Sequence, residues 1–229
     1  MTPELTNLIA ASTAFVGTHF ALSHPLRAPL ARITGEKAFP ALYSLFALAT
    51  FGWMVMAFRA VGNEGSLLWY GGSDGTWAVA TIVMLIASVL LVGSFIGNPA
   101  MPAPGAAALA AKGPHGVFHV TRHPMMWSFA LWAVVHVLVN PSPRVVVLSL
   151  AVAFLALAGS HMQDRKKEVL MGAAWQGWEA RTSYWPKLSA LGKAGMVPWL
   201  GGIALWLAAT WVHGWLIFMI PAGVWRWVG

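Results

Sequence analysis

Six segments of the chain contain no Asp, Glu, Lys or Arg over 19 or more consecutive residues. Apolar residues run through them without alternating with polar ones, so the pattern favours helices over strands. An α-helix rises about 1.5 Å per residue, and roughly 20 residues therefore cross the hydrocarbon core of a bilayer. Each segment is long enough to supply one membrane-spanning helix. The segments cover residues 5–26, 38–58, 75–111, 123–143, 145–163 and 194–225.

This pattern predicts an all-α fold, a polytopic transmembrane helical bundle with about six spans. No internal repeat is present, and residues 1–229 read as a single integral membrane domain. We expect the helices near residues 4–25, 38–60, 76–97, 123–140, 143–162 and 197–213.

The connections are marked by proline. Three prolines within residues 98–105 must end the third helix, so residues 98–122 are expected to form a loop, with a short helix near residues 106–111. The run Asn140-Pro141-Ser142-Pro143 predicts a tight turn between two antiparallel helices. Residues 163–196 are the longest polar segment and predict an amphipathic stretch on the membrane surface. Its headgroup-facing residues are expected to be Trp175, Trp178, Tyr184 and Trp185.

Composition agrees with a membrane protein, because 58% of the residues are hydrophobic and 9% are charged. A soluble domain carries about 25% charged residues. The chain has no cysteine, which excludes disulfides, iron–sulfur clusters and thiolate zinc sites. Glu4 precedes the first apolar segment and no basic residue does, so we expect no cleaved signal peptide and a retained first span.

The net charge of +7 is distributed unevenly across the membrane. With six spans the loops alternate sides, and the positive-inside rule places the more basic side in the cytoplasm, so both termini are expected to be periplasmic. We therefore read the positive charge as a signal of topology and of contact with anionic lipid, and we expect no nucleic-acid partner. The basic side carries Arg27, Arg32, Lys37, Lys112, Arg122, Arg165, Lys166, Lys167, Arg181, Lys187 and Lys193, and the other side carries Arg59, Arg144 and Arg226.

The eight histidines are the candidate functional residues. An ionisable residue inside a membrane is a functional-site hypothesis, because lipid makes its charged form costly. Neutral imidazole is also a common ligand of transition metals and of haem iron. His19 and His136 lie within apolar helices and are the best candidates. For His161 and His213 a hydrogen bond across the bundle is an equal alternative, and His24, His115 and His119 are expected in loops.

Three parts of the sequence resemble the NnrU family, which includes the zeta-carotene isomerases. The first part is THFALSHPLR at residues 18–27, followed by ITGEKAF at 33–39. The second part is GVFHVTRHPMM at residues 116–126, with His136 following it. The third part runs from Asp164 to WEARTS at residues 178–183. The match extends in order and spacing over most of the chain.

The resemblance implies a multi-pass protein of a bacterial inner (plasma) membrane. The isomerase members bind haem b through two histidines, which match His19 and His136 here by position. Their substrate is a polyene soluble in lipid, whereas bacterial members are associated with nitrogen-oxide metabolism and denitrification. A cysteine three residues before the second histidine is replaced by Ala133, so this chain has no thiolate that could exchange with imidazole as an iron ligand.

Depth complicates the assignment of an iron-binding pair. His19 is expected near the cytoplasmic end of its helix and His136 near the outer end, a difference of roughly 15 Å. Two axial ligands need nitrogens only about 4 Å apart, because each metal–nitrogen bond is about 2 Å. Tilted helices can reduce this gap. Pairs at matching depth are His136 with His213, or His19 with His123 or His161.

Two other functions were considered. Arg122-His123-Pro124 at a helix start also resembles membrane methyltransferases of the isoprenylcysteine and phospholipid type, in which this region binds S-adenosylmethionine. Arg122 and His123 would then contact the cofactor near the positive helix end. A zinc hydrolase is the weaker alternative. His115, His119 and His123 have the spacing of one helix face, but glycine and proline interrupt the segment and no acidic residue follows as a base.

Overall fold

Six long apolar helices form the body of the molecule. The structure, a computed structural model, describes residues 1–62, 65–101, 104–217 and 219–228, and no strand occurs in these ranges. The predicted all-α fold is therefore confirmed, and the predicted helices agree with the observed ones at most of their ends. The six are α1 (Pro3–Ser23), α3 (Phe39–Val61), α4 (Asp74–Gly93), α6 (Pro124–Val139), α7 (Pro143–Met171) and α9 (Met196–Val212).

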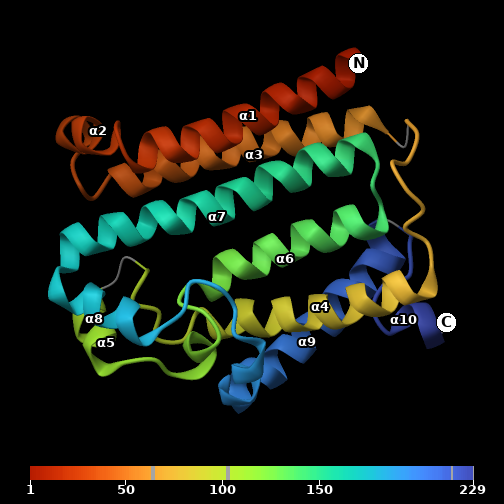
Figure 1. Cartoon of the computed structure of the whole chain (residues 1–229). Helices are drawn as coiled ribbons and strands as arrows, with labels where there is room; N and C mark the ends of the chain where they lie inside the picture. Colours follow the sequence, from red (N-terminus) through yellow and green to blue (C-terminus); the bar gives the residue numbers. More distant parts are fainter. Residues whose placement is uncertain (63–64, 102–103, 218, 229) are drawn as a thin grey trace.

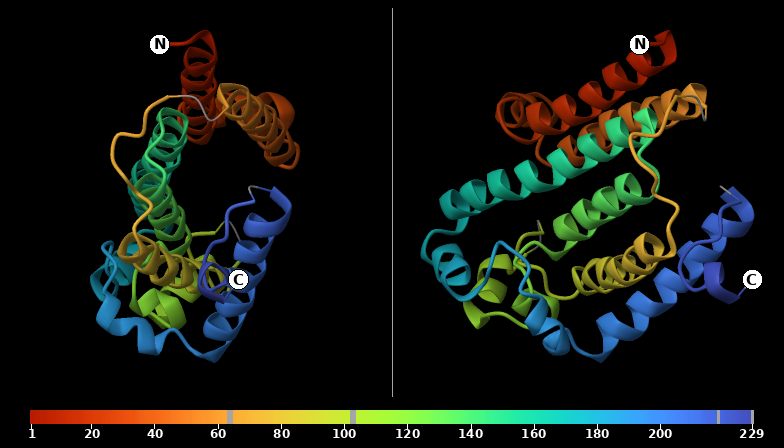
Figure 2. Two further views of the ribbon diagram at one scale, coloured as in Figure 1. Left: turned by 90° about the vertical axis from the view of Figure 1, so that its right-hand side faces the viewer. Right: turned by 45° about the vertical axis from the view of Figure 1, so that its right-hand side comes forward.

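The helices pack in an order that differs from their order in the sequence. α3 packs on α1, α1 on α7, α7 on α6, α6 on α4, and α4 on α9. This sequence of neighbours produces a curved layer, which the end-on view shows with α3 and α9 at its two ends (Figure 2, left). α7 therefore lies between α1 and α6 (Figure 1). α1 and α6 therefore lie on opposite sides of α7, which separates the residues of one helix from those of the other.

Most of the helical surface is apolar and points outward. Five of the helices are long and apolar enough to cross a membrane, and only 11% to 28% of the residues in each spanning window are buried within the protein. Large side chains such as Leu48, Leu150 and Leu200 are exposed on these helices. Lipid, rather than water, is the solvent that suits such a surface. α6 is also apolar but has only 16 residues.

Both termini lie at one end of the bundle (Figure 1). We call this the terminal end; it also holds the start of α4 and the ends of α6 and α9. The opposite end, which we call the basic end, carries α2 (Arg27–Thr34), α5 (Ala106–Lys112) and α8 (Ala173–Arg181). Successive long helices thus run in opposite directions between the two ends, as predicted (Figure 1). The remaining elements are η1 (Gly116–His119), η2 (Leu188–Lys193), η3 (His213–Ile217) and α10 (Trp225–Val228).

At the basic end the connecting segments pack into a small core of their own. Trp175 and Trp178 of α8 are fully buried there, with the ring of Trp178 5.5 Å from that of Phe118. The prediction that both tryptophans face the headgroups was wrong, because α8 turns back against η1 and α5 and covers their apolar sides. Trp185 is exposed, as predicted. The predicted short helix is present as α5.

α7 differs most from its predicted length. It was expected to end at residue 162 but continues to Met171, so residues 163–171, the first part of the predicted surface stretch, continue the long helix. The helix continues because the residues after the apolar part are strong helix formers, with neither glycine nor proline before Gly172. This extension carries Asp164 into the core of the basic end.

Candidate functional site

A buried group of charged side chains lies where α6 meets the extension of α7. Asp164 is fully buried, and its carboxylate accepts hydrogen bonds from His123 Nε2 at 2.8 Å and from Arg122 Nε at 2.9 Å. Arg122 Nη2 lies 2.8 Å from the same carboxylate and 3.2 Å from Glu179 Oε1. We call these four residues the Asp164 network. A buried carboxylate is stable only with such partners, so all four side chains are fixed together.

The backbone around the Asp164 network is held by contacts with the segment after α8. The Arg122 N–H donates to the Ser183 carbonyl at 2.8 Å, and the Thr121 hydroxyl donates to the Tyr184 carbonyl at 2.7 Å. The Tyr184 hydroxyl reaches α7, where it donates to the Leu157 carbonyl at 2.8 Å. Pro124 begins α6 in the first-turn position that suits proline. Sequence elements more than 60 residues apart thereby place Arg122 and His123 beside Asp164.

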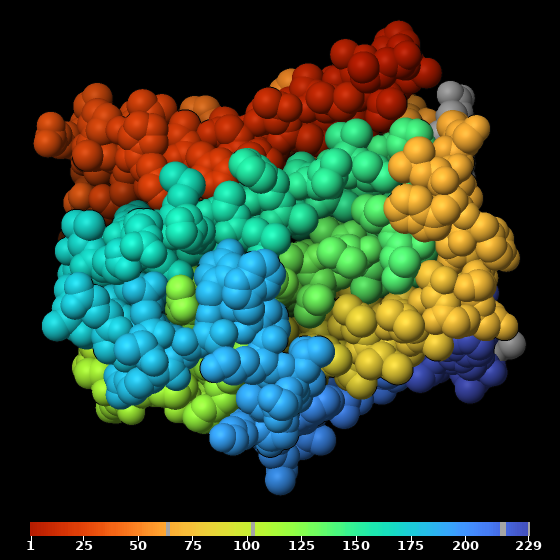
Figure 3. All heavy atoms as spheres, viewed as in Figure 1, coloured from red at the N-terminus to blue at the C-terminus, as the bar shows by residue number. Residues whose placement is uncertain are grey.

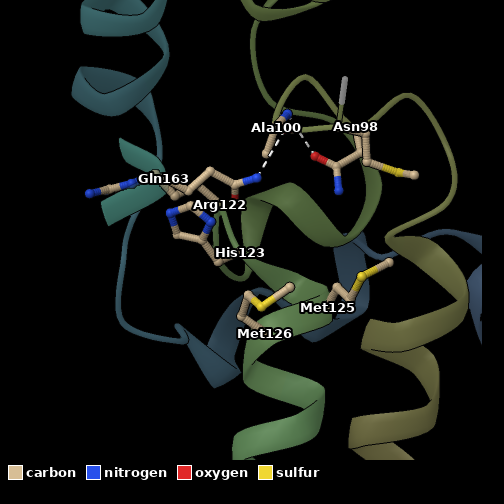
Figure 4. A pocket seen from close by; sticks show the side chains of 8 residues that line it. Asn98, Ala100, Arg122, His123, Met125, Met126 and Gln163 are labelled. Atoms are coloured by element: carbon tan, nitrogen blue, oxygen red, sulfur yellow. Dashed lines mark hydrogen bonds between the residues drawn. The ribbon is translucent and has the colours of Figure 1, made fainter. Parts of the chain in front are cut away.

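A cavity of about 40 Å³ adjoins the Asp164 network. Arg122, His123 and Gln163 line it together with Met125 and Met126, and Figure 4 shows these side chains around it. A carboxylate oxygen only accepts, so His123 Nε2 carries a proton, and in the neutral ring Nδ1 is the nitrogen with the lone pair. A cavity of this volume is large enough for a water molecule.

Glu179 connects the Asp164 network to the surface of the basic end. Burial raises the pKa of Glu179, and a hydrogen bond with Glu168 and the charge of Asp164 raise it further, whereas the Arg122 guanidinium acts in the opposite direction. Glu168 is in turn paired with Arg165 at 2.9 Å. A chain of ionisable groups therefore leads from the solvated surface of α7 to the buried Asp164.

The second candidate site is at the terminal end, where the structure brings together two of the predicted histidines. The ring centroids of His136 on α6 and His213 at the end of α9 are 6.5 Å apart, with 63° between the ring planes. His136 Nδ1 donates to the Trp132 carbonyl at 2.8 Å, and its ring lies 4.0 Å from the Trp132 ring. His213 Nδ1 donates to the Ile220 carbonyl at 3.0 Å. In both rings Nε2 is therefore the lone-pair nitrogen of the neutral form.

A loop covers the terminal end of α6 next to His136. The Trp69 indole N–H donates to the Leu138 carbonyl at 3.1 Å, and the Leu68 N–H donates to the Pro141 carbonyl at 3.2 Å. Gly71 allows the close approach, since a Cβ there would come within 2.4 Å of the Val139 carbonyl oxygen. Figure 3 shows residues 65–73 spread over this end of the molecule.

His19 lies elsewhere in the bundle. It is on α1, near the basic end, and its ring neighbours are Phe15 at 4.3 Å and Tyr43 of α3 at 5.6 Å. Its Nδ1 donates to the Phe15 carbonyl at 2.7 Å. Among the contacts of the described residues, none joins His19 to His136, and α7 lies between their helices. The depth difference expected from the sequence is thus present in the fold.

The remaining histidines are dispersed. His161 is exposed on α7, and His24 ends α1. The His115 ring lies with Nε2 3.3 Å from the Ile96 carbonyl oxygen and Nδ1 3.5 Å from the Gly113 carbonyl oxygen, either of which can accept its N–H. Burial lowers the pKa of His119, with Lys193 and His115 adding to the effect. No group of three or more His, Asp or Glu side chains suited to a metal ion occurs among the described residues. The three histidines considered for zinc lie on separate elements, η1 and the segments on either side of it.

The sequence reasoning missed the role of Asp164. We expected no acidic residue to act as a base beside His115, His119 and His123, whereas Asp164 pairs directly with His123. One signal was available, because Asp164 follows a charge-free run of 19 residues that must leave the membrane as a helix. The separation of 41 residues between His123 and Asp164 gave no indication that they meet.

The apolar outward surface, the alternating helices and the charged basic end define this molecule as a polytopic helical membrane protein. The family model described as NnrU protein matches residues 7–221, nearly the whole chain. The chain belongs to the NnrU family. Comparisons with curated proteins and with solved structures gave no match.

Proposed function

We propose that this NnrU-family protein binds haem b within the membrane, with His136 as an axial ligand of the iron. The supporting observation is the hydrogen bonding of His136, which lies in an apolar helix and donates its Nδ1–H to the Trp132 carbonyl. Histidines that ligate metals usually donate their other ring N–H to such an acceptor, which fixes the tautomer and the ring orientation. Stacking on Trp132 holds the ring further.

The donor set of the chain fits haem better than other metal groups. Without cysteine, the membrane segments offer imidazole nitrogens as their strong ligands. A structural zinc ion needs four ligands, and the described residues contain no suitable cluster. A haem would need only one or two protein ligands and an apolar surrounding, which His136 and the apolar side chains of α6 would supply.

The reaction that we assign to the bound haem is cis–trans isomerisation of a polyene dissolved in the bilayer. Haem iron supplies chemistry that shifts electron density in the polyene and lowers the barrier to rotation about a double bond. The chain itself supplies ligation by His136 and apolar walls that exclude water. A role in nitrogen-oxide metabolism would use the same site with a small ligand at the iron.

The methyltransferase alternative has less support. Arg122 would have to bind an anionic group of S-adenosylmethionine, yet its guanidinium already pairs with Asp164 and Glu179. Calorimetry with S-adenosylmethionine should therefore detect no binding, and micromolar binding that Arg122→Ala abolishes would reverse this ranking.

An absorption spectrum of the detergent-purified protein tests the proposal directly. We expect a Soret band and a pyridine haemochrome spectrum of haem b. His136→Ala should lose haem or change its coordination, whereas His115→Ala, outside the apolar helices, should leave the spectrum unchanged. A protein produced with haem available and purified without any Soret band would refute haem binding.

We also infer that the basic end faces the cytoplasm of a bacterial cell and that both termini face the periplasm. The support is the 11 of 14 basic residues that lie at the basic end, on its short helices, the extension of α7 and the segments between them. Reporter fusions to the C-terminus should be active when the reporter requires export. Activity only of a reporter that works in the cytoplasm would contradict this orientation.

A further inference from the structure

We propose that an anionic phospholipid binds at the basic end, with part of an acyl chain in a cavity between α4, η1 and the start of α9, and with its phosphate beside Lys193 and His119. The cavity shares no lining residue with the one beside the Asp164 network. The proposal does not depend on haem binding. It also goes beyond a general attraction of basic loops to anionic lipid, because it assigns both ends of the lipid to a defined place.

The cavity is the first observation. Its volume is about 210 Å³, and it lies where the end of α4 meets η1 and the start of α9. α4 packs on both of these elements, and the start of α9 lies beside the end of α4 at the basic end (Figure 1). Two lining residues, Gly116 and Gly195, have positive φ values of +54° and +90°, which glycine adopts without strain. Neither has a side chain that could fill the space between the two turns.

The walls of the cavity suit hydrocarbon. His115 is the one ionisable side chain among the lining residues, and most of the others are apolar. Ile96, Met196 and Val197 line the cavity and are exposed, so it is open to the surroundings of the bundle. An apolar cavity of about 150 Å³ already admits benzene, and several methylene groups therefore fit here. Filling the space with an acyl chain would also restore the close packing that protein interiors normally have.

Positive charge beside the cavity is the second observation. His119 directly follows the lining residue Phe118, Lys193 directly precedes the lining residue Ala194, and their elements η1 and η2 pack together. Burial lowers the pKa of His119, and the charges of Lys193 and His115 lower it further, so the three groups lie near one another. None of the ion pairs of the described residues includes His119 or Lys193. A phosphate would supply the negative charge that this cluster lacks.

The start of α9 adds to the attraction for a phosphate. Gly195 is the N-cap of this helix and provides no side-chain acceptor for its first N–H groups. Such N–H groups and the helix dipole favour an anion. Because Gly195 also lines the cavity, these groups lie at the same opening and act together with Lys193 and His119.

The test measures lipid binding to the detergent-purified protein by native mass spectrometry, with phosphatidylglycerol and phosphatidylcholine of the same acyl chains as the two probes. We expect phosphatidylglycerol to bind more tightly. Lys193→Gln should weaken its binding about fivefold, because a basic residue near a membrane surface contributes about 1 kcal/mol. Lys37→Gln is the matched control, since Lys37 is also an exposed lysine of the basic end. Equal affinity for the two lipids, or equal losses in the two variants, would overturn the proposal.

Two further measurements test the place of the acyl chain. Val197→Trp should fill the opening of the cavity and prevent retention of phosphatidylglycerol, whereas Leu200→Trp, on the same helix but outside the lining, should not. Both positions are exposed, so the larger side chain does not disturb the core. Glycerol phosphate, which has the phosphate but no acyl chain, should fail to displace the lipid. Unchanged retention in Val197→Trp, or displacement by glycerol phosphate at equal concentration, would exclude the cavity as the lipid site.

Discussion

Replacement of Asp164 by Asn should destabilise the protein more than any other single change of an Asp or Glu side chain that the structure describes. The carboxylate is fully buried and accepts three close contacts, one from His123 and two from Arg122. Asn keeps the shape, but it removes the charge and turns one acceptor into a donor that faces another donor.

The size of the expected loss in unfolding free energy depends on which charges remain without a partner. Removing one partner of a buried ion pair costs about 3–5 kcal/mol, because the other charge is left uncompensated. Here Arg122 keeps Glu179 at 3.2 Å and is 13% exposed at its side chain, so part of its charge stays balanced. We therefore expect the lower end of that range, about 3 kcal/mol.

The assay is reversible unfolding in mixed detergent micelles, followed by tryptophan fluorescence. Asp74→Asn is the matched control, since the Asp74 side chain is 79% exposed and lies 3.5 Å from Arg226. An exposed pair of this kind contributes less than about 1 kcal/mol. The double variant Arg122→Gln with Asp164→Asn should cost less than the sum of the single variants. Equal, small losses in Asp164→Asn and Asp74→Asn would refute the reasoning.

Two further predictions concern packing and pH. Gly202→Ala should lower the free energy of unfolding by about 1–3 kcal/mol, because a Cβ there would lie 2.6 Å from the Val89 Cα on α4. Gly17→Ala, with open space around the new Cβ, should be neutral or stabilising in the same unfolding assay. The raised pKa of Glu179 favours its protonated form in the folded state. Its contribution to the free energy of unfolding is therefore fully present below the ordinary pKa of glutamate and is lost as the pH rises through the raised pKa. Glu179→Gln should flatten this part of the stability profile, and an unchanged slope would contradict the assignment.

The sequence predicted the spans because lipid imposes one dominant constraint, continuous apolar residues of sufficient length. It failed where the chain leaves the membrane. Trp175 and Trp178 look like interfacial anchors by composition, yet they are buried because α8 folds back after Gly172, and the sequence does not show what surface α8 then covers. The extension of α7 was missed because helix propensity acts beyond the last apolar residue.

The candidate sites were predictable to different degrees. His136 was identified because it is an ionisable residue in an apolar helix, which is a local property. His213 was a candidate partner of His136 only because the two lie at similar depth. The packing of α6 and α9 on α4 brings their ring centroids to 6.5 Å, which the sequence alone does not show. His123 and Asp164 pair because α6 and the extension of α7 meet at the basic end. The spacing of the two residues along the chain does not predict that contact.

The short length of α6 has a consequence for the surrounding bilayer. Its 16 residues span about 24 Å, whereas the hydrocarbon core of a typical bilayer is about 30 Å thick. α6 contacts lipid directly, since Phe129 and Val134 are exposed on it. Lipid beside this helix must compress, at a cost of fractions of a kcal/mol per Å of hydrophobic mismatch. The protein should thus create a thinned patch of membrane next to α6, and should be more stable in bilayers of short-chain lipids than in thick ones.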